Sequence, residues 1–333
     1  MPLTPHALRR VCREAATQPF DRAAVALNED WGTALDGKHL QRWAQPVGAR
    51  LARERDAAVR ASESGRPPAA PENAPQLLAI GLDGGRIQMR EADPTTGSRW
   101  REDKVAAVTS YQSGADGPQP LVTTHVATLE PAAAFGRQAR VEAERRGLAQ
   151  AAQVLILGDG GNWIDPVVER EFPEAVRILD WYHASQHLYA CARARYGDEE
   201  ARVGRWAAQL KTQLWSGAVN EVITELAKAS RQLGPPQDVD GPEHPRRILA
   251  CNVEYFRHNQ AHMAYPEYRR KGWPIGSGNV EAGVKLFNKR VKGTEQFWQP
   301  AGAEAMLCLR ALWIAQDDRW KRYWRSRPAY RAA

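Results

Sequence analysis

Three acidic residues, Asp83, Asp159 and Glu281, stand where their side chains could hold divalent metal ions. Asp83 and Asp159 each follow a short apolar run and lie close before glycines, and Glu281 falls in the first turn of a helix that Ser277 or Asn279 can cap. Carboxylates brought close together repel one another unless a cation lies among them, and hard divalent ions prefer carboxylate oxygen. Either aspartate alone is best interpreted as a turn residue, but the ordered set of three predicts a Mg²⁺ site, with Mn²⁺ as an alternative.

Two such ions would support one particular chemistry. At a separation of roughly 4 Å they can activate an attacking oxygen and stabilise a leaving oxygen at a phosphodiester. In this arrangement Asp83 would bridge both ions, while Asp159 and Glu281 would each hold one. The set therefore predicts metal-dependent cleavage or transfer of a nucleic-acid strand.

A basic face accompanies Glu281 on the predicted helix. Lys285 and Lys289 follow it at i+4 and i+8 and share its face, and Arg290 and Lys292 widen the positive surface. Taken alone, the stretch fits a capped surface helix with ordinary salt bridges. Beside a metal site, the same cations are suited to the nucleic-acid backbone, so all four are predicted to bind DNA.

Asp180 and His183 form a second candidate feature. The acid ends a predicted strand and the imidazole lies three residues later, near a helix start, so an Asp–His contact can brace the rim of the site. His183 and His187 are also spaced i, i+4, which permits metal ligation, but we favour a supporting role for His183. His258 and His262 repeat this spacing without nearby acids and are interpreted as helix-surface residues.

The elements that must position these residues alternate in type along the chain. Short apolar runs predict buried strands at 77–82, 154–157 and 176–179, which end at Asp83, Asp159 and Asp180. Gly84-Gly85 predicts a tight turn, with 86–91 returning as a hairpin strand. Further strands are expected within 100–109 and 121–129, and helices over 132–146 and 163–171. This order indicates a mixed α/β sheet whose strand ends bring the aspartates to one rim.

Changes in composition divide the chain into five segments. Residues 1–61 are predicted to be helical, as a helix-turn-helix or, slightly better, as a plain helical hairpin, and residues 62–75 as a linker. The core is expected over 76–180, a helical insertion over 181–270, and the rest of the core over 271–333, which includes a helix at 301–315. The tail interleaves Trp and Tyr with Arg and Lys, which fits nucleic-acid binding and amphipathic end-packing about equally.

Composition sets the broad class. A chain of 333 residues has room for two or three domains, and a formal charge of +7 with a pI near 9.3 leans mildly toward a polyanionic partner. The four cysteines are far apart, with no CxxC pair, which disfavours a zinc knuckle and fits a reducing compartment. No stretch approaches the roughly 18–20 apolar residues of a membrane span. Neither a phosphate-binding loop motif nor a nucleophile elbow is present.

Several stretches resemble the DDE transposases of ISKra-type bacterial insertion sequences. They are 157–164 (LGDGGNWI), 172–176 (FPEAV), 178–184 (ILDWYHA), 272–281 (GWPIGSGNVE) and 309–312 (LRAL), within a match that runs from about residue 77 to 324. The resemblance implies an RNase H-like core interrupted by a helical insertion, with Asp83, Asp159 and Glu281 as the catalytic set. It also implies that Asp180 and His183 correspond to the C/D-x-x-H signature of some transposase groups.

The sequence thus predicts a DNA transposase that cuts element ends and joins them to target DNA with two Mg²⁺ ions. Double-stranded DNA is the expected partner, with homo-oligomers formed on it, and the bacterial cytoplasm and nucleoid are the expected location, with no membrane association. Only about 75 residues precede the core, fewer than family members usually carry. This motivates two alternatives, a transposase-derived DNA-binding regulator without catalysis and a purely hydrolytic DNA nuclease.

Overall fold

A computed structural model describes residues 3–112, 114, 117–276, 278–292 and 296–326, without the side chains of 278–284. The strands are β1 (Leu77–Gln88), β2 (Trp100–Gln112), β3 (Gln119–Thr128), β4 (Gln153–Gly158) and β5 (Val176–Leu179). The helices before the last strand are α1 (Pro5–Thr17), α2 (Phe20–Trp31), α3 (Gly37–Glu63), α4 (Ala132–Arg145) and α5 (Ile164–Glu171). Those after it are α6 (Trp181–Tyr196), α7 (Glu200–Trp215), α8 (Val219–Leu233), α9 (Pro245–His258), α10 (Tyr265–Arg270), α11 (Gly278–Val291), α12 (Pro300–Ile314) and α13 (Arg319–Arg325).

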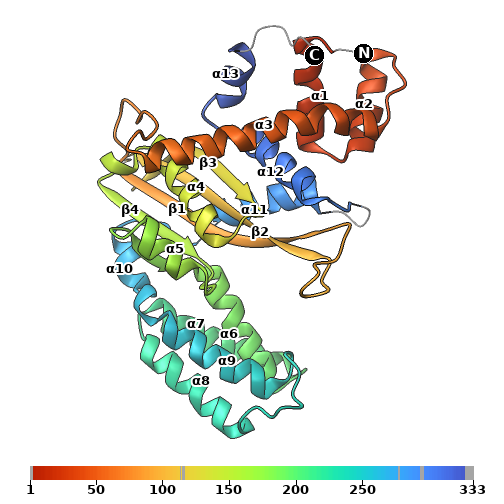
Figure 1. Ribbon diagram of the computed structural model, residues 1–333. Coiled ribbons are helices and arrows are strands. Elements are labelled where there is room, and N and C mark those ends of the chain that lie inside the picture. Colours follow the sequence, from red (N-terminus) through yellow and green to blue (C-terminus); the bar gives the residue numbers. More distant parts are fainter. Residues whose placement is uncertain (1–2, 113, 115–116, 277, 293–295, 327–333) are drawn as a thin grey trace.

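The five strands form one mixed sheet in the order β3-β2-β1-β4-β5 (Figure 1). β2 is antiparallel to both of its neighbours, while β1, β4 and β5 run parallel to one another. A sheet of this order, with only the second strand reversed, is the arrangement of the RNase H-like fold. The predicted α/β class with an RNase H-like mixed sheet is therefore confirmed.

The first strand corrects one sequence prediction. Gly84 and Gly85 do not form a turn, because β1 continues through them to Gln88 and pairs both with β2, opposite Lys104 and Asp103. The chain reverses only after Met89 and before Arg99, whose carbonyl accepts a hydrogen bond from the Met89 amide. Asp83 therefore lies inside β1 rather than at its end.

Three groups of buried side chains cover the sheet. On one face, Ile80 and Leu82 of β1 pack against Phe135 of α4 and Ile164 of α5. On the other face, the end of the sheet that carries Leu77 packs against the helical block α6–α10. The opposite end of that face packs against α1, α3, α11 and α12. The insertion between β5 and α11 thus shares its core with the sheet.

The N-terminal helices are joined to the sheet rather than separated from it. Figure 1 shows the long helix α3 running beside the sheet, with α1 and α2 at one of its ends. α3 packs along α12, and Gly48 lies so close to it that a Cβ there would be 2.1 Å from the Ala305 carbonyl oxygen. Glycine is needed at this crossing because the two backbones approach directly.

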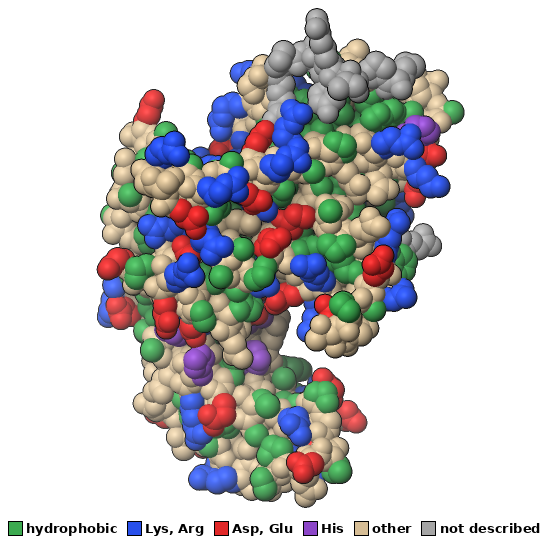
Figure 2. Space-filling model, in the orientation of Figure 1, with side chains coloured by type: hydrophobic (Ala, Val, Ile, Leu, Met, Phe, Trp, Pro, Cys, Tyr) green, Lys and Arg blue, Asp and Glu red, His purple; other side chains and the backbone are tan. Residues whose placement is uncertain are grey.

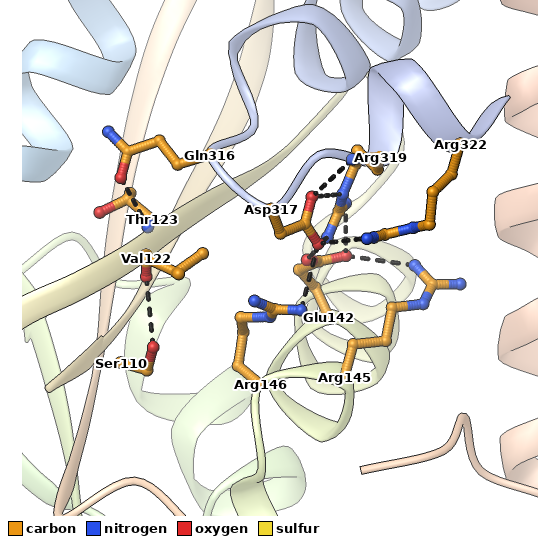
Figure 3. A network of polar contacts seen from close by, with 10 residues as sticks. All are labelled: Ser110, Val122, Thr123, Glu142, Arg145, Arg146, Gln316, Asp317, Arg319 and Arg322. Carbon is orange, nitrogen blue, oxygen red and sulfur yellow. Dashed lines mark hydrogen bonds and ion pairs between the residues drawn. The ribbon is translucent and has the colours of Figure 1, made fainter. Parts of the chain in front are cut away.

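The C-terminal helix α13 is held by packing and by ion pairs. Trp320 is 7% exposed and contacts Trp313 and Trp324, as expected for end-packing. Figure 3 shows Arg319 between the carboxylates of Glu142 from α4 and Asp317, to both of which it donates hydrogen bonds.

On the face drawn in Figure 2, acidic and basic side chains are interspersed over the part of the molecule that contains the sheet. Among the described helices, none has both the length and the apolar character to cross a bilayer.

Candidate metal and nucleic-acid site

Strand register places three of the predicted acids side by side. Leu82 pairs with Gly158, and Gly158 pairs with Leu179, so Asp83, Asp159 and Asp180 are each the next residue of three neighbouring parallel strands. Neighbouring strands lie about 4.8 Å apart. The three aspartates therefore lie at one level of the sheet, where β4 and β5 end and β1 continues.

Asp83 and Asp159 are both half-buried. Burial raises the pKa of Asp83 to about 6, and the negative charges of Asp159 and Asp180 add to this, while the Gly84 amide, which donates to Asp83 Oδ1 over 2.6 Å, opposes it. Asp159 Oδ1 accepts one hydrogen bond, from the Gly161 amide. Among the described residues, the second oxygen of each acid has no hydrogen-bond donor, and a bound cation would relieve the repulsion between the two carboxylates.

The turn that carries Asp159 is fixed from the helical insertion. The Tyr255 hydroxyl of α9 donates a hydrogen bond to the Asp159 carbonyl oxygen over 2.7 Å. Gly160 has a φ of +84°, and a Cβ there would lie 2.8 Å from the Tyr255 ring. The sequence analysis missed this role of Tyr255, because 96 residues separate it from Asp159 and no local pattern marks the contact.

Asp180 acts differently from the other two aspartates. It is fully buried, and its Oδ1 accepts a hydrogen bond from the His183 amide as the N-cap of α6. His183 Nδ1 lies 3.4 Å from the same oxygen. The pKa of His183 is raised, first by its contact with Asp180 and further by the charges of Asp83 and Asp159. The negative charges of all three aspartates therefore favour the protonated form of His183.

The other histidines are engaged elsewhere. His187 Nδ1 is 2.6 Å from Asn252 Oδ1, and its ring stacks on Tyr255. The interpretation of His258 as lacking nearby acids is wrong, because its Nε2 lies 2.8 Å from Asp165 Oδ2 of α5. Ring contacts and an acid 93 positions away in the sequence could not be predicted from i, i+4 spacing.

Helix α11 carries the fourth predicted acid and the basic face. The helix packs on β1 and β2, but the side chain of Glu281 lies outside the described residues, as does Ser277. Lys285, Lys289 and Lys292 are exposed. Within the residues described, no group of three His, Cys, Asp or Glu side chains is arranged to hold a metal ion.

Arg290 is a correction to the predicted cationic surface. It is fully buried, where its Nε donates to the Ala15 carbonyl oxygen and its Nη1 to Gln296 Oε1. Arg310 donates similarly to the Ala16 carbonyl. The last carbonyls of a helix lack partners within it, so these two arginines complete the end of α1. Burial lowers the pKa of Arg290 to about 9.

The predicted site residues lie away from the cavity of about 580 Å³ between α3, α4, α12 and α13, and none of them lines it. Asp83 and Asp159 are instead half-buried on the sheet. Because the expected chemistry acts on a long polymer, half-exposed acids beside a basic helix suit it better than an enclosed cavity.

No family model matches the chain, and no match is found among curated proteins. Among solved structures, the chain is similar to one described as a Drosophila P element transposase strand transfer complex. That similarity has 10% sequence identity and a TM-score of 0.41, and it covers 96% of this chain and 94% of the other.

Proposed function

We propose that this chain is a DNA transposase that cuts element ends and joins them to target DNA, using divalent metal ions held by Asp83, Asp159 and Glu281. The observation that supports it most is the register of β1 and β4, which brings Asp83 and Asp159 side by side and half-exposed. Two half-buried carboxylates side by side fit a Mg²⁺ or Mn²⁺ ion, which binds through oxygen.

The position of Glu281 in α11 supports its inclusion. Glu281 precedes Asn288 by seven residues, close to two helical turns, so both positions occupy the same face of the helix. Asn288 lies over Gly85 of β1, two residues beyond Asp83. Glu281 therefore belongs to the helix that packs on β1, the strand that carries Asp83.

The chain's own residues would divide the work as follows. The three carboxylates would bind the ions, and the Asp180–His183 pair would hold the start of α6 beside them. When bound, the ions would activate the attacking oxygen and stabilise the leaving one. The exposed Lys285, Lys289 and Lys292 would bind the DNA backbone along α11.

The experiment is a strand-cleavage and strand-joining assay with Mg²⁺, using duplex DNA that carries the terminal repeats flanking the gene. We expect wild-type protein to nick and join, and Asp159→Asn to lose both activities by roughly 10³-fold or more, about 4 kcal/mol of transition-state stabilisation. Asp238→Asn, a substitution of the same type at an exposed loop residue, is the matched control. Unchanged activity in Asp159→Asn would contradict the proposed site.

The same assay separates the two other functions that the sequence allows. Binding without cleavage under any divalent ion would indicate a regulator. Cleavage without joined products would indicate a nuclease. The mass of the protein–DNA complex tests the expected homo-oligomer, because a transposase that pairs two element ends needs more than one copy at them.

A further inference from the structure

A buried carboxylate of β2 has no partner in the fold. Asp103 is fully buried, and neither of its side-chain oxygens has a hydrogen-bond partner among the described residues. Asn288 of α11 has a buried Oδ1 that also lacks a donor. Unpaired buried polar oxygens are costly, and a buried charge without a counter-ion is costlier still.

These oxygens converge on one point of the sheet. Gly85 of β1 pairs with Asp103, and a Cβ at Gly85 would lie 2.6 Å from Asp103 Oδ1, 3.1 Å from Asp103 Oδ2 and 3.1 Å from Asn288 Oδ1. Because position 85 has no side chain, the Asp103 carboxylate of β2 and the Asn288 amide oxygen of α11 both occupy the space beside it. A cation stabilises two acceptor groups that face each other in this way without a donor between them.

The charges nearby do not already provide that cation. Burial raises the pKa of Asp103 to about 6, with smaller contributions from Asp83 and Glu102, so the carboxylate is mostly ionised at neutral pH. The backbone amide of Asp103 opposes this shift most, and Lys292 opposes it by its charge. The Lys292 side chain is exposed and forms no hydrogen bond or ion pair with Asp103 in the part of the chain that is described. The ionised carboxylate is therefore left without a direct counter-ion.

We propose that Asp103 and Asn288 hold a hard metal cation between β2 and α11, at a site separate from Asp83 and Asp159. The ligands would be the Asp103 carboxylate and the Asn288 amide oxygen, with water completing the shell. Carboxylate, amide carbonyl and water oxygens are ligands of Mg²⁺, Mn²⁺ and Ca²⁺ rather than of soft metals. The bound cation neutralises Asp103 and ties α11 to the sheet.

This site bears on the position of Glu281. Because Asn288 and Glu281 occupy one face of α11, a cation that fixes Asn288 over Gly85 also fixes the register of the helix against β1. That consequence rests on the proposed function, whereas the cation site itself does not. Loss of the site would loosen α11 without removing any of the three carboxylates assigned to chemistry.

The test counts bound Mn²⁺ on the full-length protein by titration calorimetry and by electron paramagnetic resonance. In the Asp83→Asn/Asp159→Asn variant, where the proposed catalytic site is disabled, we expect one equivalent of Mn²⁺ to bind with a Kd of about 1 mM or tighter. Adding Asp103→Asn should abolish that binding. Repeating the titration in K⁺ and in Na⁺ shows whether a monovalent ion competes for the same oxygens.

Further variants keep the result interpretable if Asp103→Asn folds poorly. Gly85→Ala places a methyl group among the three oxygens and should also abolish binding, whereas Asn288→Asp adds a carboxylate and should bind Mn²⁺ at least ten-fold tighter. Glu91→Gln, at an exposed acid of the β1–β2 hairpin, should change nothing. No Mn²⁺ in the double variant, or retention after Asp103→Asn, overturns the proposal.

The two proposals fail in distinguishable ways. If Mn²⁺ binding is the same in wild-type protein and in the Asp83→Asn/Asp159→Asn variant, the catalytic assignment fails while the Asp103 site stands. The alternative to a cation is that the Asn288 amide is turned round, so that its NH₂ group donates a hydrogen bond to Asp103. In that case Asn288→Asp would place two carboxylates together with no metal between them. That variant would then lose thermal stability and gain no Mn²⁺ affinity, and the cation site would be excluded.

Discussion

Asp83 and Asp159 occupy the same level of two neighbouring parallel strands, since each directly follows one residue of the Leu82–Gly158 pair. This relationship holds although Asp83 lies inside β1 and Asp159 lies just beyond β4. Two half-buried acids in this position destabilise each other unless a cation is bound, because like charges at adjacent strands repel.

The first prediction concerns Asp83 and pH. Its pKa in the folded protein is about 6, raised from 3.8 by burial first and by Asp159 next, so the folded state binds a proton more readily than the unfolded state. Between about pH 4 and 6 this group therefore lowers the free energy of unfolding as pH rises. In EDTA, Asp83→Asn should stabilise the protein near neutral pH by on the order of 1 kcal/mol, and much less near pH 4.

Urea denaturation at the two pH values measures this difference. Adding Mg²⁺ should stabilise the wild type by mass action more than it stabilises Asp83→Asn, which keeps only the site proposed at Asp103. A variant that is less stable than wild type in EDTA at neutral pH would show that Asp83 is already compensated, and the predicted metal site would lose its physical basis.

The second prediction separates the lysines of α11 from Arg290. Each of Lys285→Ala and Lys289→Ala should weaken binding to duplex DNA of any sequence, and should reduce the slope of log K against log salt by about 0.9 for each phosphate that the protein no longer neutralises. Fluorescence anisotropy over a range of salt concentrations gives the slope. Lys211→Ala, at an exposed position of α7, is the control.

Arg290→Met should behave in the opposite way. Its side chain contacts the end of α1 rather than solvent, so its loss leaves the Ala15 carbonyl unsatisfied. We expect a lower thermal midpoint with an unchanged salt slope. A changed slope at full stability would instead support Arg290 as a residue that binds DNA.

How much of this can be predicted from the sequence depends on the range of the interaction. Apolar runs followed by aspartate identify β1, β4 and β5, because a strand that is buried on both faces consists of consecutive apolar residues. Gly84-Gly85 is misleading because paired glycines are typical of turns. Gly85 is needed here because a Cβ would collide with Asp103, and that residue lies on the partner strand, where the local sequence does not reveal it. Arg290 misleads because its partner, the end of α1, is 275 positions away.

The third prediction concerns the ion pairs of Figure 3. Glu142 is almost fully buried, and Arg319 and Arg145 both donate to it. The charge of Arg319 overcomes the cost of burial and lowers the pKa of Glu142 below its ordinary 4.5. The stability that Glu142 contributes is therefore complete above about pH 4.5 and is lost as pH falls through its lower folded-state value.

Glu142→Gln should lower the free energy of unfolding by about 1.5–3 kcal/mol at neutral pH, because it removes one of the two carboxylates that Arg319 binds and leaves Asp317 as the other. The difference from wild type should shrink near pH 3. Urea denaturation at both pH values checks it, with Glu174→Gln at an exposed acid as control. An equal loss at both pH values would mean that shape, not charge, is responsible.

The last prediction tests whether the N-terminal helices belong to the core. At Gly48 of α3, an added Cβ would lie 2.1 Å from the Ala305 carbonyl oxygen and 2.6 Å from its carbon, so one backbone must move. Gly48→Ala should therefore cost about 2–3 kcal/mol in global unfolding. Gly204→Ala, in α7 with no atom within 4 Å of the new Cβ, should instead stabilise by about 0.5–1 kcal/mol. If Gly48→Ala leaves the main unfolding transition unchanged and a separate early one appears, the helices fold apart from the sheet.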